Sequence, residues 1–433
     1  MVFGFNQYSG LLLPFFVQGM VVAAVLVVRS RRNDAAADRW LALLLLLHAL
    51  RLAQWMLGFA GWYDAHDAHS TFMFYFPFHH WLAVGPALYF YFRSLTNQEF
   101  RLTRRHWRAF GPELAWLGLY LVGLLYDVGW WHGLRGQPLP AHFGTKGPVA
   151  AWADEQPIKV VVDILSYVLV LYFTLRTLRE YRAYARYLND NFSDTDRIRF
   201  RWLRNVLIAV GIGTGVTLVF GVVNLVVPLS YYQAWYDYLF TGLLLYYLSI
   251  AGLLTGYRLA SLRFQPAEEA PVPDLLPEPP ILVQPPTAAP AKARQLLAAA
   301  GAAANLAAPA PTPAPAPDAP ELERWTQRLL RHMEAERPYL APELTLGELA
   351  TQLRTNTSWL SRVINAGCGQ NFNDFINEYR IREAERRLRD PQFRHYTLLA
   401  VALEVGFNSK STFNRVFRKL RGVTPSEVAR RST

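Results

Sequence analysis

The sequence contains very little cysteine: Cys368 is the only one among 433 residues. A single thiol excludes an internal disulfide framework and a zinc site built from several cysteines. The sequence also lacks GxSxG, P-loop and glycine-rich dinucleotide patterns, and the adjacent His79 and His80 do not have the His-x-x-x-His spacing of a helical metal site. We therefore expect no enzyme, metal or cofactor, and a packing role for Cys368.

Lysine and arginine are absent before Arg29, so the first apolar run has no positive n-region of a cleavable signal peptide. Hydrophobic residues make up 52% of the chain and aromatic residues 14%, and residues 1–263 hold most of the long apolar runs. Seven runs approach the roughly 20 residues that a bilayer requires. They are 11–28, 40–61, 71–92, 110–131, 157–175, 203–227 and 233–257. We expect an all-α chain whose residues 1–263 form a seven-helix transmembrane sensor domain.

Basic residues alternate between the loops that separate these runs. Loops 29–39, 93–109 and 176–202 carry four, five and seven Lys or Arg, whereas loops 62–70, 132–156 and 228–232 carry none, two and none. Loops rich in Lys and Arg stay in the cytoplasm. The pattern predicts a multi-pass protein of the bacterial inner membrane, with its amino terminus outside and all residues after Tyr257 in the cytoplasm.

Polar residues inside the apolar runs are costly in lipid and by default mark function. We expect Arg51 at mid-helix to pair with Asp163 or Asp237, and most of the other polar groups to lie in the outer half. Two interpretations stay open: an outward-opening ligand pocket lined by aromatic side chains, or structural pairs that hold the helices together. The set comprises His48, Arg51, His79, His80, Asp127, Asp163, Asn224 and Asp237.

Residues 264–320 differ sharply in composition, because they hold 15 of the 28 prolines and few aromatic residues. Such a segment cannot bury enough apolar surface to fold, so we expect a disordered Pro/Ala-rich linker. Formal charge is +8 for residues 1–263, −3 for 264–320 and +6 for 321–433. The basic third region is typical of a domain that binds a polyanion.

The stretch 398–420 predicts two short helices around a turn. Leu398–Val405 is apolar on most sides and should be buried, and Gly406 is placed to end that helix in a left-handed conformation. Asn408 or Ser409 can cap the next helix, whose inward stripe consists of Phe413, Val416, Phe417 and Leu420. A buried helix, a glycine turn and a cationic helix predict a helix-turn-helix, whose second helix enters the DNA major groove.

A second unit of this kind is predicted upstream. Thr345 and Glu348 have the spacing of a capping box, a turn follows at 354–356, and a helix is expected over 357–366. A longer helix, 372–389, joins the two units. Two units on one chain would place two recognition helices in successive major grooves, about 34 Å apart.

A specific motif accompanies this pattern: Ala402-x3-Gly406-Phe407-x5-Phe413-x-Arg415-x-Phe417-Arg418-Lys419, then Gly422-x-Thr424-Pro425-x-Glu427. On these residues, 339–431 resembles the DNA-binding domain of AraC/XylS transcription regulators. The resemblance implies DNA contacts by Ser358, Ser361, Arg362, Lys410, Ser411, Thr412, Asn414, Arg415, Arg418 and Lys419. We expect Arg418 and Lys419 to bind phosphate, and Arg415 alternatively to pair with Glu404. The run 85–95 resembles multi-helix sensor domains of bacterial regulators.

The sequence as a whole predicts a membrane-bound, sequence-specific DNA-binding transcription regulator that couples an extracytoplasmic or membrane signal to gene expression. Its expected partners are double-stranded DNA, the lipid bilayer, a small-molecule ligand and a second copy of the chain. Coupling would act through dimerisation or through masking of the DNA surface. Two alternatives remain: a transporter or membrane enzyme with a regulatory DNA-binding tail, and a passively tethered factor released by proteolysis.

Overall fold

The computed structural model describes residues 4–431 apart from 34, 64–69, 71–72, 98, 140–146, 196–197, 199–200, 227–230 and 255–318. The described residues form helices and no strand, which confirms the all-α prediction. The chain divides into two compact units, one of Met1–Leu188 with Thr195–Gln265 and one of Asn189–Asp194 with Pro266–Thr433. Nearly all of the predicted linker, 264–318 of 264–320, lies outside the described residues.

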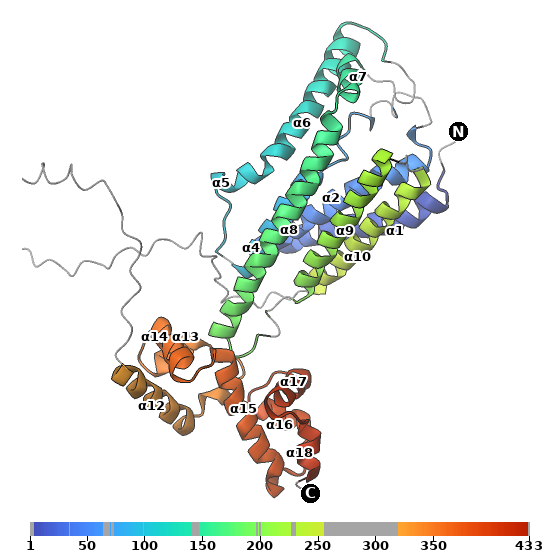
Figure 1. Cartoon of the computed structure of the whole chain (residues 1–433). Helices are drawn as coiled ribbons and strands as arrows, with labels where there is room; N and C mark the ends of the chain where they lie inside the picture. Colours follow the sequence, from blue (N-terminus) through green and yellow to red (C-terminus); the bar gives the residue numbers. More distant parts are fainter. Residues whose placement is uncertain are drawn as a thin grey trace, which may run out of the picture. The chain divides into compact units, whose positions relative to one another are not determined.

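The first unit is built from long helices (Figure 1). In it α1 packs along α2 and α10, α4 packs on α2, and α9 packs on α10. The elements are α1 Gln7–Asn33, α2 Ala36–Phe59, α4 Trp81–Thr96, α5 Arg104–Trp107, η2 Arg108–Phe110, α6 Gly111–Leu124, η3 Leu125–Leu134, α7 Pro148–Glu155, α8 Ile158–Asn191, α9 Arg201–Val226 and α10 Tyr231–Leu254.

Within the described residues, five helical stretches are long and apolar enough to cross a membrane: Gln7–Asn33, Ala36–Phe59, Arg104–Leu134, Ile158–Asn191 and Trp235–Leu254. A shorter apolar stretch, Trp202–Val216, lies in α9. These helices leave large apolar side chains exposed, such as Leu125 (61%) and Val161 (59%). Contiguous apolar surface of this kind is unusual in a soluble monomer and favours contact with lipid. By length and composition, five stretches among the described residues qualify as membrane-spanning, whereas the sequence predicted seven.

The predicted helix over 71–92 is shorter in the structure, where α4 begins only at Trp81. Pro77 accounts for the late start, because proline lacks a backbone N–H and disfavours helical geometry at the preceding Phe76. With 16 residues, α4 is shorter than the roughly 20 that span a bilayer. His79 and His80 therefore precede a helix, and their predicted position inside one is wrong.

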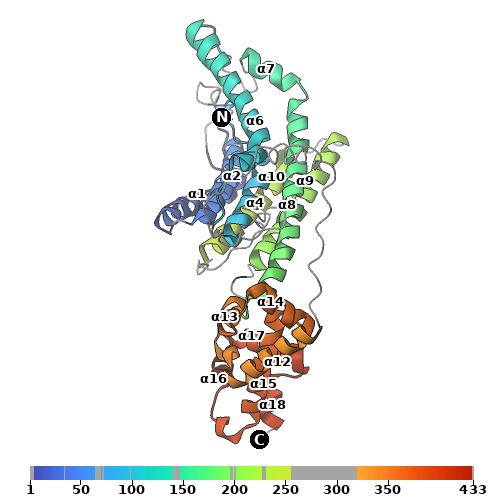
Figure 2. The same ribbon diagram turned by 90° about the vertical axis from the view of Figure 1, so that its left-hand side faces the viewer.

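The second unit consists of short helices arranged around α15, Phe372–Arg389 (Figure 2). This helix supplies side chains to two hydrophobic cores: Phe372, Phe375 and Ile376 to one, and Ile381 and Ala384 to the other. The remaining elements are α12 Ala319–Ala335, η4 Pro338–Leu340, α13 Leu346–Gln352, α14 Thr357–Arg362, η5 Val363–Gly367, η6 Pro391–Phe393, α16 Leu398–Glu404, α17 Lys410–Arg421 and α18 Pro425–Arg431. We call α13 with α14 the first helix pair, and α16 with α17 the second helix pair.

Candidate nucleic-acid interface

The turn of the second helix pair is determined by two local features. Ser409, one of the two predicted caps, accepts a hydrogen bond at Oγ from the Thr412 amide (3.2 Å) and so satisfies a free N–H at the start of α17. Gly406 has φ +91°, and a Cβ there would lie 2.7 Å from the Tyr339 carbonyl oxygen. Only glycine fits both the left-handed backbone and this close approach.

Helix α17 has one apolar and one polar face, as the sequence predicted. Phe413, Val416 and Phe417 are buried in the second core. Away from that core, five of the predicted DNA-contacting residues are exposed, and Thr412 and Asn414 are half-buried. Thr412 accepts a hydrogen bond from the Ser409 hydroxyl (2.8 Å), and the buried Oδ1 of Asn414 has no hydrogen-bond partner among the described residues. The exposed residues are Lys410, Ser411, Arg415, Arg418 and Lys419.

Helix α16 is less buried than the sequence predicted. Val401 and Ala402 are in the core, but Leu399 is 43% exposed and Leu403 is 49% exposed. The helix is only seven residues long and packs against α15 and α17. The face of α16 that carries Leu399 and Leu403 is therefore exposed to solvent, and the predicted burial on most sides is wrong.

The first helix pair has the capping box predicted for it and a further cap that the sequence analysis did not assign. The Thr345 amide donates to Glu348 Oε2 (2.9 Å), and the Glu348 amide donates to Thr345 Oγ1 (3.2 Å), which together form a capping box. Asn356 caps α14 by accepting a hydrogen bond from the Trp359 amide (2.7 Å). The helix predicted over 357–366 is an α-helix to Arg362 and continues as a π-helix from Val363 to Gly367.

The predicted DNA contacts of the first pair lie on α14. Ser358 and Arg362 are exposed. Ser361 is half-buried, and its hydroxyl accepts a hydrogen bond from Asn365 Nδ2 (3.3 Å). Each helix pair thus presents a polar, cationic surface on its second helix, although α14 carries fewer cationic groups than α17.

Ion pairs fasten the carboxyl-terminal half of α17 to α15. Lys419 Nζ lies 2.8 Å from Asp374 Oδ1, and Arg421 contacts Glu378 (3.0 Å) and Glu385 (2.9 Å). An exposed pair such as that of Lys419 contributes at most about 1 kcal/mol, so DNA phosphate could displace Asp374 there.

The alternative role predicted for Arg415 was an ion pair with Glu404. Glu404 contacts Arg387 of α15. This ion pair links α16 to α15 at the surface.

Arg380 on α15 was not identified from the sequence, and it is the most connected side chain of this unit. It is 1% exposed, and its Nε and Nη2 donate to the carbonyl oxygens of Tyr339 and Ala341, both at 2.7 Å. Burial lowers the pKa of Arg380 to about 10, so the guanidinium stays protonated at neutral pH. The available signal was its spacing: Arg380 lies four residues from both Ile376 and Ala384, on the buried face of the helix.

The basic run at the end of α15 forms ion pairs within its own helix. Arg386 and Arg387 both donate to the buried carboxylate of Glu383, and Arg389 pairs with Glu385. The hydrogen bonds from Arg386, with a smaller contribution from Arg387, lower the pKa of Glu383 to about 2. These arginines therefore have structural partners.

In the first unit, the structure selects Asp237 from the two partners predicted for Arg51. Arg51 Nη2 lies 2.5 Å from Asp237 Oδ2, and Nη1 donates to Thr241 Oγ1 (2.8 Å). The guanidinium also stacks on the rings of Trp81 (4.4 Å) and Tyr238 (4.7 Å). Arg51 thus connects α2 to α10 and to the start of α4.

The other predicted polar residues whose side chains the structure describes also contact protein groups. His79 Nε2 lies 3.5 Å from Asp163 Oδ1, and His80 Nδ1 lies 2.7 Å from Glu113 Oε1. These contacts favour the structural interpretation of the set over a ligand pocket. His48 Nδ1 lies 2.8 Å from the Leu44 carbonyl oxygen, Asp127 accepts from the Tyr75 hydroxyl and from the amides of Val149 and Ala150, and Asn224 lies on α9 with its side chain outside the described residues.

Comparison with known proteins shows which type of domain the second unit contains. Residues 349–431 match the family model described as "Helix-turn-helix domain". The chain carries an AraC-type helix-turn-helix domain. The matched residues include α14 to α18 and the last four of the seven residues of α13.

One similar protein is the "Uncharacterized HTH-type transcriptional regulator YtdP" of Bacillus subtilis (strain 168), which is 30% identical over 83 residues. The aligned part is 19% of this chain and only 10% of that protein, so the similarity concerns the helix-turn-helix domain. No solved structure matches the chain.

Proposed function

We propose that this chain is a membrane-anchored transcription regulator, in which the first unit senses a signal in or across the membrane and the helix-turn-helix domain binds specific DNA sequences. The match of residues 349–431 to a helix-turn-helix domain supports DNA as a partner and transcription regulation as the function. Five helical stretches of membrane-spanning length in the same chain support the membrane anchor.

In this proposal both helix pairs are helix-turn-helix units, and α14 and α17 enter successive major grooves. The exposed cationic face of α17 supports the leading role of the second pair in base contacts. Lys410 and Arg415 can bind guanine, and Asn414 is a residue type that can bind adenine through its amide. Arg418 and Lys419 bind phosphate, which makes the affinity dependent on salt.

The variant Lys410→Ala with Asn414→Ala tests the assignment of α17. Site-specific affinity should fall at least about thirtyfold, because each good base contact contributes about 1–3 kcal/mol of discrimination. The measurement is footprinting of the full chain on DNA fragments selected from its own genome. Arg430→Ala on α18 is the matched control, since it removes an exposed cation that we assign no base contact. Unchanged footprints in the double variant would exclude α17 as the recognition helix.

The two alternatives predict different observations. A passively tethered factor predicts a soluble, fully active fragment that arises by cleavage within 264–320. Blotting for such a fragment under inducing and non-inducing conditions separates it from an intact sensor. A transporter or membrane enzyme predicts flux or turnover by residues 1–257 alone.

A further inference from the structure

A short segment far from the helix-turn-helix domain in sequence packs with it in space. Residues Asn189–Asp194 belong to the second compact unit, although more than 120 residues separate them from α12. The Ser193 amide donates to the Leu344 carbonyl oxygen (3.1 Å), and Phe192 forms an isolated antiparallel bridge with Thr345. The segment therefore pairs its backbone with the residues that begin α13.

Side chains of α15 recognise the same backbone. Asn373 Nδ2 donates to the carbonyl oxygens of both Phe192 (3.1 Å) and Ser193 (2.8 Å). Arg380 donates from Nη2 to the Ser193 hydroxyl (3.1 Å). The same guanidinium also donates to the carbonyl oxygens of Tyr339 and Ala341. Ser193 is only 3% exposed. Because burying polar groups is costly unless they are paired, the buried and hydrogen-bonded Ser193 and Arg380 indicate a built docking site.

The segment ends at the turn before the recognition helix. Asp194 Oδ2 accepts a hydrogen bond of 2.6 Å from Asn408 Nδ2. Asn408 directly precedes Ser409, the cap of α17, and lies two residues before Lys410. Asp194 thus places a carboxylate at the amino-terminal end of α17, where the helix dipole and Lys410 would otherwise attract a DNA phosphate.

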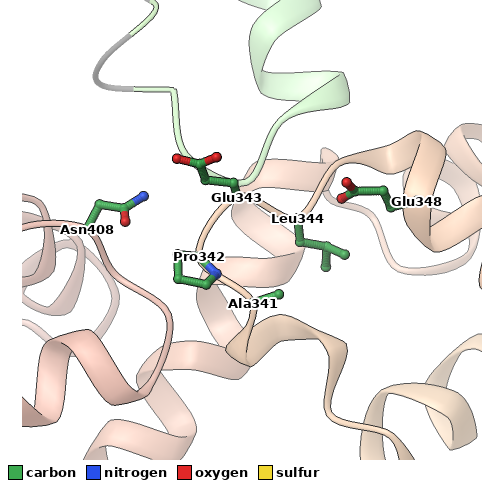
Figure 3. A pocket seen from close by; sticks show the side chains of 6 residues that line it. All are labelled: Ala341, Pro342, Glu343, Leu344, Glu348 and Asn408. Atoms are coloured by element: carbon green, nitrogen blue, oxygen red, sulfur yellow. The ribbon is translucent and has the colours of Figure 1, made fainter. Parts of the chain in front are cut away.

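An open pocket lies beside this contact, between the two helix pairs (Figure 3). Asn408, in the turn between α16 and α17, lines the pocket on one side. The other five residues belong to the stretch before α13 and to the start of α13. Glu343 and Glu348 are among them, so the pocket is acidic. It provides a second carboxylate near Asn408 that does not bind the segment, which is useful as a control.

We propose that Asn189–Asp194 is an intramolecular ligand of the helix-turn-helix domain that competes with DNA. This inference rests on the proposed DNA-binding function and names its regulation. The docked segment joins the start of α13, the start of α15 and the turn before α17, so it fixes both helix pairs together. Its carboxylate opposes the approach of phosphate to α17. Asn189–Asn191 are also the last residues of α8, a helix of membrane-spanning length, so a change in α8 reaches the segment through the chain.

A reversible cross-link tests the competition in the full-length chain in detergent micelles. The variant carries Asp194→Cys and Asn408→Cys, with Cys368→Ser to remove the native thiol. Mild oxidation should join the two cysteines, and saturating 30-bp duplex DNA of random sequence should suppress the reaction. The oxidised chain should bind this duplex at least about tenfold more weakly than the same chain after reduction. A chain with Asp194→Cys and Arg430→Cys is the control and should not cross-link.

Three results would overturn the proposal: no cross-link, a cross-link that DNA does not suppress, or equal DNA binding by oxidised and reduced chains. Failure of the reduced chain to bind any DNA would refute the proposed function as well, so the two failures are distinguishable.

A charge-matched pair of single variants supplies a second test. Asp194→Ala should tighten binding of the same duplex about tenfold, since it removes a hydrogen bond to a charged group from the competing state. Glu343→Ala removes the same charge from the neighbouring pocket but leaves the segment contacts intact, and should change binding much less. Equal gains in the two variants would mean that general charge repulsion operates, which contradicts docking.

Discussion

At the scale of single residues, Arg380 and Gly406 determine how the stretch before α13 packs against α15 and the turn of the second pair. Arg380 binds the carbonyl oxygens of Tyr339 and Ala341, and Gly406 allows the Tyr339 backbone to approach the turn of the second pair. The sequence predicted Gly406, because a glycine after an apolar helix has a local meaning. It did not reveal the function of Arg380, because an arginine in a helix is usually exposed and its partners lie about 40 residues away.

Gly406→Ala should destabilise the domain by roughly 2–4 kcal/mol, since it adds backbone strain at φ +91° and a clash with the Tyr339 carbonyl oxygen. Gly422→Ala is the matched control: its φ is +73°, but nothing lies within 4 Å of the added Cβ. It should cost about 1 kcal/mol. Scanning calorimetry of the purified chain measures both, and equal losses would refute the role of the close approach.

Glu383 contributes to the folding stability of the domain, and acid removes this contribution. Its pKa is lowered from 4.5 to about 2, so the stability it supplies is fully present above pH 4.5 and is lost as the pH falls through 2. Glu383→Gln should therefore lower the unfolding temperature by a constant amount between pH 7 and pH 5. The difference between the two chains should shrink towards pH 2. A difference that stays constant down to pH 2 would contradict the paired carboxylate.

At the scale of elements, local rules predicted the second unit well. Apolar periodicity placed α15 at its observed bounds, and a capping box placed the start of α13 correctly. These features depend on hydrogen bonds between residues three or four apart. The late start of α4, the exposed face of α16 and the docking of Asn189–Asp194 depend on neighbours distant in sequence. Apolar periodicity cannot predict them.

The Arg51–Asp237 pair should determine how α2 and α10 pack. Arg51→Asp alone should destabilise the first unit by about 3 kcal/mol, the scale for breaking a buried ion pair. The exchange Arg51→Asp with Asp237→Arg should restore part of that loss. Thermal stability in detergent, followed by size-exclusion chromatography, measures both variants. If the exchange recovers nothing beyond the single variants, the pair does not hold these helices together.

At the scale of the whole molecule, the chain combines helical stretches of membrane-spanning length, five of them among the described residues, with an AraC-type helix-turn-helix domain. The sequence predicted this combination from composition and motif. In the first unit, Arg51, His79 and His80 each contact an acidic residue, which supports a structural role for these polar groups. The central claim is that DNA is bound by the intact, membrane-anchored chain.

The most direct test is to cross-link the chain to DNA in cells, isolate the membrane fraction and sequence the DNA recovered with the full-length chain. We expect discrete genomic sites that disappear in the variant Lys410→Ala with Asn414→Ala and persist in Arg430→Ala. Recovery of DNA only with a soluble fragment that lacks residues 1–257, or no enrichment in the membrane fraction, would contradict the claim.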